Sequence, residues 1–162
     1  MSNIIYPFQT PIYQSYIDSI SFTQIKKDVN LFIDNNFNLF NNRLGWDCPT
    51  LTTQGISVEQ NIKSNKLVEE IQNHVQNFWN IWEFSITKKL YIEQLWVNIS
   101  KKGDYQEVHD HGDCLFSGTV YINVDEHSGD FVLQNPLYVE NILMKDSNII
   151  PKSYFITPEN SM

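Results

Sequence analysis

The sequence predicts an α+β domain in which two N-terminal helices pack outside an antiparallel, jelly-roll-like β core. Apolar residues recur at helical spacing in the first half of the chain, whereas β-prone runs separated by turn signals follow from Leu90 onward. The 162 residues contain no internal repeat and no flexible linker. We therefore expect one domain over 1–162, helical over about 1–89 and β over about 90–162.

Each predicted helix carries one apolar stripe. The first begins with Ser21 or Thr23 as N-cap and ends at residues 34–36. Its apolar positions are Phe22, Ile25, Val29, Phe32 and Ile33. The second begins after Ser64. Its apolar positions are Leu67, Val68, Ile71, Val75, Phe78, Trp79 and Trp82. His74 lies beside that stripe, which is more typical of a structural or solvated histidine than of a metal ligand.

The predicted β core begins with the long β-prone run 90–99. A glycine turn at 101–104 leads into a short strand that carries two histidines, and 115–124 forms the next strand. Shorter strand candidates are 55–59, 131–133 (after a turn at 127–130), 138–143 and 149–156.

His109 and His111 form the sharpest chemical signal in the sequence. Residues two apart on a strand point to the same face, so both imidazoles can close on one metal ion. Neutral imidazole binds iron, zinc, copper and nickel. A third ligand would require Asp110 or Asp113 to turn inward, and Asp110 alternates to the opposite face. The alternative interpretation is a pair of surface histidines at the end of a hairpin strand.

Five short motifs follow one another in a fixed order. They are Leu95-Trp96-Val97-Asn98, Gly103-Asp104-Tyr105, His109-Asp110-His111, Ser117-Gly118-Thr119-Val120-Tyr121-Ile122 and Ser128-Gly129-Asp130-Phe131. With these motifs the chain resembles small Fe(II)/2-oxoglutarate-dependent oxygenases of the double-stranded β-helix (jelly-roll, cupin-like) fold, which occur in marine bacteria and phages. The resemblance implies a dioxygenase that hydroxylates an unknown substrate. Fe(II) would lie on His109 and His111, and Tyr121 near the carboxylate of the cosubstrate 2-oxoglutarate. A core-facing aromatic is the other interpretation of Tyr121.

The same resemblance implies groups that the given sequence lacks. His111 stands where the wider superfamily has a carboxylate. A distal histidine ligand and an arginine for 2-oxoglutarate would follow a segment similar to 150–160, yet the sequence stops at Met162 and its one arginine is Arg43. Missing C-terminal strands would expose sheet edges and apolar surface. A partner chain, a repacked fold or a truncated product would each account for this.

Two other functions stay open at this point. One is a catalytically inactive jelly-roll-like interaction protein or phage accessory protein without a complete metal site. The other is a cupin-like metalloenzyme that uses another metal. Metal analysis of protein purified without added iron distinguishes the second of these from an iron enzyme.

Composition limits the partners and the compartment. The net charge of −8 argues against a nucleic-acid partner, which requires clustered Lys and Arg. No apolar run has the length of a membrane span, and no signal peptide is indicated. Cys48 and Cys114 are expected to be free thiols, which favours the cytoplasm. The expected partners are a small-molecule or protein substrate, and a second copy or partner chain that covers an exposed sheet edge.

Overall fold

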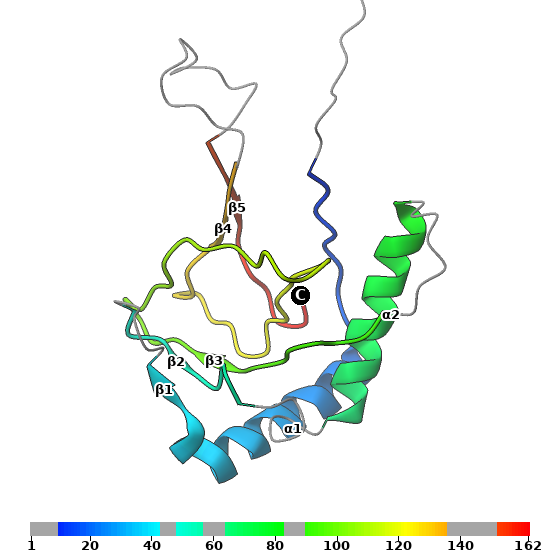
Figure 1. Ribbon diagram of the computed structural model, residues 1–162. Helices are drawn as coiled ribbons and strands as arrows, with labels where there is room; N and C mark the ends of the chain where they lie inside the picture. The colour runs from blue at the N-terminus through cyan, green and yellow to red at the C-terminus, as the bar shows by residue number, and fades with distance from the viewer. Residues whose placement is uncertain (1–9, 43–47, 57–63, 83–89, 136–151) are drawn as a thin grey trace, which may run out of the picture.

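The computed structural model describes residues 10–42, 48–56, 64–82, 90–135 and 152–162 (Figure 1). These ranges contain two α-helices and two small antiparallel sheets, so the α+β class is confirmed. The jelly-roll arrangement of the core stays a prediction. The strand predicted at 138–143 lies outside the described residues. Within the described ranges, no helix has the length and apolar character needed to cross a membrane.

Helix α1 runs from Ser19 to Asn36 and begins earlier than the sequence predicted. Its N-cap is Asp18, whose carboxylate accepts hydrogen bonds from the backbone N–H groups of Ile20 (3.0 Å) and Ser21 (3.1 Å). The predicted caps Ser21 and Thr23 are therefore wrong, because both residues lie inside the helix. An aspartate satisfies the free N–H groups of a first turn as well as a hydroxyl does.

Helix α2 runs from Asn65 to Ile81 and is capped by Ser64, as predicted. The Ser64 hydroxyl accepts from the Leu67 N–H at 3.3 Å and donates to the Asp28 carboxylate at 2.8 Å. One side chain thus caps α2 and ties its start to α1, and the two helices converge at this end (Figure 1). Trp82, which the sequence places in the apolar stripe of this helix, is its C-cap and is 41% exposed.

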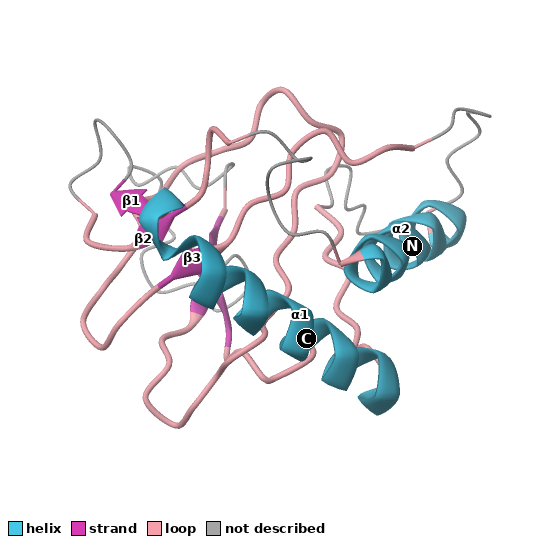
Figure 2. Cartoon of the chain, turned by 90° about the horizontal axis from the view of Figure 1, so that it is seen from below, coloured by secondary structure: helices cyan, strands magenta, loops and turns pink. Residues whose placement is uncertain are grey.

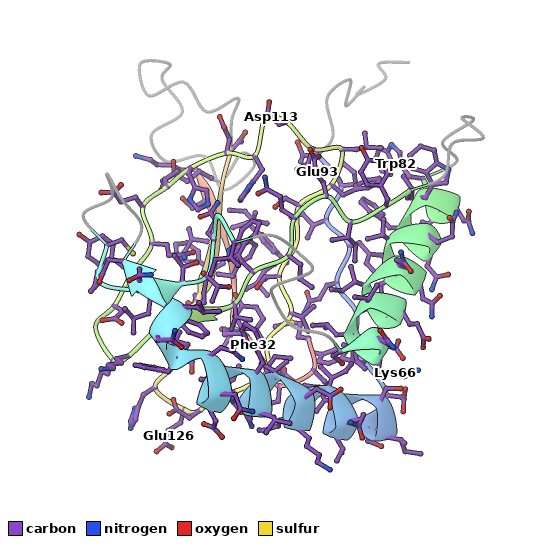
Figure 3. The ribbon with its side chains drawn as sticks, turned by 60° about the horizontal axis from the view of Figure 1, so that its bottom comes forward. Phe32, Lys66, Trp82, Glu93, Asp113 and Glu126 are labelled. Atoms are coloured by element: carbon purple, nitrogen blue, oxygen red, sulfur yellow. The ribbon has the colours of Figure 1, made fainter. Side chains whose placement is uncertain are left out.

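The hydrophobic core lies between the helices and the long loops that follow them. Its buried centre is Ile17, Ile25, Val29 and Leu67. Seven half-buried residues pack against this centre: Phe22, Phe32, Ile33, Ile71, Leu95, Val120 and Ile122. Figure 3 shows Phe32 on the side of α1 that faces these loops. The apolar stripes predicted for both helices therefore face the interior, except at exposed Trp82.

A small three-stranded sheet lies next to the end of α1. A 3-10 turn at Phe37–Leu39 leads into β1 (Asn41–Asn42), and β2 (Leu51–Thr52) lies between β1 and β3 (Asn98–Ile99). Both pairings are antiparallel. Only the last two residues of the β-prone run 90–99 therefore belong to a strand.

The second sheet is a two-stranded ribbon of β4 (Phe131–Gln134) and β5 (Ser153–Ile156). β5 lies within the strand candidate 149–156, and β4 extends the candidate 131–133 by one residue. Val132 and Phe155 are directly opposite each other and are 43% and 62% exposed. The chain between β3 and β4 forms no strand, contrary to the prediction for the histidine segment and for 115–124 (Figure 2).

Residues 160–162 join two distant parts of the chain (Figure 1). The Ser161 N–H donates to the Tyr121 carbonyl at 2.9 Å, and the Ser161 carbonyl accepts from the Ile17 N–H at 2.9 Å. The Asn160 side chain makes two bonds to Val124, accepting from its N–H at 2.9 Å and donating to its carbonyl at 3.1 Å. This segment therefore connects the start of α1 with the loop that carries Tyr121.

Candidate metal centre

His109 and His111 lie side by side, although no strand holds them. Their ring centroids are 4.9 Å apart and the ring planes cross at 68°. His109 is exposed and His111 is half-buried. The predicted strand is absent, and the two rings are neighbours without it. The structure thus brings together the two residues that the sequence proposed as metal ligands.

A tight turn at residues 101–104 precedes the histidine segment, as predicted. The Asp104 N–H donates to the Lys101 carbonyl at 2.9 Å, and the Asp104 carboxylate accepts from the Lys101 N–H at 2.8 Å. Gly103 has a φ of +90°, a conformation that glycine adopts at little cost. The turn therefore sets where the extended histidine segment begins.

A backbone carbonyl orients the His109 ring. Nδ1 of His109 lies 2.7 Å from the carbonyl oxygen of Glu107. A carbonyl only accepts hydrogen bonds, so Nδ1 carries the proton and the lone pair of the neutral ring is on Nε2. Metal-binding histidines commonly have this second hydrogen bond, which fixes both the tautomer and the ring direction. His109 thus fits a role as an Nε2 ligand.

His111 packs against an aromatic ring. The Trp96 and His111 ring centroids are 5.8 Å apart with the planes inclined at 30°. The thiol of Cys114 donates to the His111 carbonyl at 3.4 Å, which closes the turn after the histidine. A hydrogen bond thus orients His109, and an aromatic ring lies beside His111.

The described residues provide two donors and no third. Among them, no group of three His, Cys, Asp or Glu side chains is placed to hold a metal ion. Asp110 and Asp113 are exposed, and Asp113 points away from the rest of the chain (Figure 3). His127 lies in an exposed turn with its Nε2 3.7 Å from the Glu126 carboxylate. The described residues therefore offer two neighbouring imidazole donors.

The remaining histidine, His74, has a structural contact, in keeping with the sequence interpretation. Its Nδ1 lies 3.2 Å from the Tyr13 hydroxyl. The Tyr13 ring stacks on Phe78 of the same helix, with 5.6 Å between the ring centroids. This contact packs the chain before α1 against α2.

Tyr121 is half-buried, and its backbone is bonded on both sides by the C-terminal residues. Its N–H donates to the Met162 carbonyl at 2.8 Å. Burial raises the pKa of the Tyr121 phenol, and the negative charge of Asp130 raises it further. The phenol is therefore neutral at physiological pH and can donate a hydrogen bond to an anion.

Comparison with known families singles out the part of the chain that carries these residues. Residues 94–154 match a family model described as "Putative 2OG-Fe(II) oxygenase". This segment is similar to 2OG-Fe(II) oxygenases. No curated protein and no solved structure matches the chain. The matched range includes Trp96, both histidines of the pair and Tyr121.

Sequence reasoning did not find the residues that orient the pair. In the sequence, Trp96 is only one member of a motif, and its ring contact with His111 joins two loops of the folded chain. The Glu107 carbonyl is a backbone group, which no side-chain pattern reveals. The two-bond contact of Asn160 with Val124 likewise depends on the tertiary fold.

Proposed function

We propose that this protein is an Fe(II)- and 2-oxoglutarate-dependent dioxygenase that hydroxylates a substrate of unknown identity. One observation carries the proposal: the rings of His109 and His111 lie 4.9 Å apart within the range that matches the oxygenase family. Two adjacent imidazoles are suitable donors for Fe(II).

The reaction balances as follows. One dioxygen, one 2-oxoglutarate and one C–H bond of the substrate yield succinate, carbon dioxide and an alcohol. One oxygen atom enters the new carboxylate of succinate and the other enters the alcohol. When bound, Fe(II) supplies the redox chemistry that dioxygen requires for this oxidation.

The residues have separate roles in this proposal. Nε2 of His109 and the imidazole of His111 hold the iron. The Tyr121 phenol donates a hydrogen bond to a carboxylate of 2-oxoglutarate. A third ligand and a cation for the other carboxylate would come from outside the described residues. A jelly-roll core that encloses the pair remains part of the proposal.

Metal titration with matched histidine variants tests the site. Fe(II) is titrated anaerobically into the purified protein by calorimetry, in the presence and absence of 2-oxoglutarate. We expect saturable binding that His109→Ala and His111→Ala each weaken by at least 10-fold, since each removes one donor. His127→Ala is the matched control, because His127 is exposed and lies in a separate turn. Its affinity should equal that of the unaltered protein.

Turnover provides the second readout. With Fe(II), 2-oxoglutarate and dioxygen, the unaltered protein should form succinate slowly even without its substrate, and the two histidine variants should not. Absence of saturable Fe(II) binding, or equal binding by all three variants, would contradict the proposal. Metal binding without any 2-oxoglutarate binding would favour a metalloprotein of another class.

A further inference from the structure

We propose that Trp96 is a positioning residue for His111, and that Thr53 holds Trp96 in place. The inference deepens the proposed iron site and rests on it for its effect on metal affinity. The observation that carries it is a continuous set of contacts from a fully buried threonine, through a backbone and an indole ring, to one imidazole of the pair.

The first link is the buried side chain of Thr53. This side chain is fully buried, with 0% exposure. Its Oγ1 accepts from the Val97 N–H at 3.0 Å, and its own backbone N–H donates to the Val97 carbonyl at 3.1 Å. These bonds continue the pairing of β2 with β3 by one residue pair beyond Thr52 and Asn98. Both backbone groups of Val97 are therefore fixed.

The second link is the indole itself. Trp96 directly precedes Val97, so the fixed peptide sets the direction of its side chain. Trp96 is half-buried, and its ring lies beside the His111 imidazole with 5.8 Å between the ring centroids and 30° between the ring planes. An imidazole rotates about its second side-chain torsion in a broad well. A broad flat neighbour limits that rotation.

The two histidines are thus pre-oriented by different devices. The Glu107 carbonyl sets the His109 ring by a hydrogen bond, whereas Trp96 sets the His111 ring by contact. Loss of a neighbour that orients a metal ligand commonly weakens metal affinity by about 10- to 100-fold. A stacking contact lacks the directionality of a hydrogen bond, so we expect the lower end of that range.

Metal affinity of Trp96 variants tests the inference. We expect Trp96→Leu to weaken Fe(II) binding by roughly 10-fold, while Trp96→Phe, which keeps an aromatic face, restores most of the loss. Trp82→Leu is the matched control, because Trp82 ends α2 and is 41% exposed. It should bind Fe(II) as the unaltered protein does. In the His111→Ala background, Trp96→Leu should have no further effect, since the residue acts through that ring.

A metal-free measurement separates this inference from the proposed function. In the apo protein, the indole ring current should displace the His111 ring-proton resonances relative to those of exposed His127. Loss of the displacement in Trp96→Leu is expected. If His111 and His127 resonate alike in the unaltered protein, Trp96 does not order the ring and the inference is wrong, even where a variant fails to fold. If the displacement is present but no Fe(II) binds, the proposed function is wrong and the stacking has no role in metal binding.

Discussion

Replacing Thr53 by valine tests the hydrogen bond that joins the two halves of the chain. The Thr53 side chain is fully buried and its Oγ1 accepts from the Val97 N–H at 3.0 Å. Valine fills almost the same volume but cannot accept, so a backbone N–H is left unpaired in the interior. Such a group costs about 1–3 kcal/mol of unfolding free energy. At roughly 2–4 °C per kcal/mol for a chain of this size, the melting temperature should fall by about 2–12 °C.

Urea unfolding followed by circular dichroism measures this loss. Thr53→Ser keeps the hydroxyl and should recover most of the stability. Thr23→Val is the matched control, because the Thr23 hydroxyl is exposed and bonds only within α1, to the Ser19 carbonyl at 2.7 Å. Its effect should stay within about 0.5 kcal/mol. The reasoning fails if Thr53→Val is as stable as the unaltered protein, or if Thr23→Val loses as much.

Three further outcomes are expected. Ile25→Ala should lower the unfolding free energy by about 2–5 kcal/mol in urea titrations, because Ile25 is fully buried. Ile20→Ala should have little effect, because Ile20 is 83% exposed. Equal losses in the two variants would contradict the assigned core. Hydrogen bonds from Ser21 lower the pKa of the Asp18 carboxyl below 3.8. The ionised carboxylate therefore stabilises the folded protein fully above pH 3.8, and this stabilisation is lost as the pH falls through the lowered pKa. Asp18→Asn should keep the cap and remove this acid dependence of the melting temperature. Burial raises the pKa of the Tyr121 phenol above 10. The neutral phenol therefore contributes to the unfolding free energy below pH 10, and this contribution is lost as the pH rises through the raised pKa. Tyrosinate absorbance should show one late-titrating phenol that Tyr121→Phe removes.

The helices were predictable because their signals are local. Apolar spacing along Leu67 to Trp79, with Ser64 three residues before that run, placed α2 correctly. The start of α1 was misplaced because the predicted apolar stripe begins only at Phe22, whereas the buried core already includes Ile17. Two hydroxyl residues next to the stripe, Ser21 and Thr23, are typical caps by residue type, but the cap is Asp18.

The strands were harder to predict because a strand requires a partner. A β-prone run favours extended backbone, but the residues with which it pairs lie elsewhere in the chain. Only Asn98–Ile99 of the long run 90–99 finds a partner, in β2. His109 and His111 are neighbours as predicted, with 4.9 Å between their ring centroids, although no strand forms there. Their supporting contacts do not follow from the sequence, because Trp96 and His111 meet only in the folded chain.

The bond between Ile17 and Ser161 has a consequence for the newly made protein. Its two ends are about 144 residues apart in the chain. At roughly 5–20 residues per second, the ribosome adds Ser161 roughly 7–29 s after Ile17. In the earlier part of that interval α1 lacks the contacts it later makes with Leu95 and Val120, and an isolated helix of its length is marginal in water. Its apolar side is thus available to chaperones until Leu95 and Val120 have been made, and the bond to Ser161 forms later still.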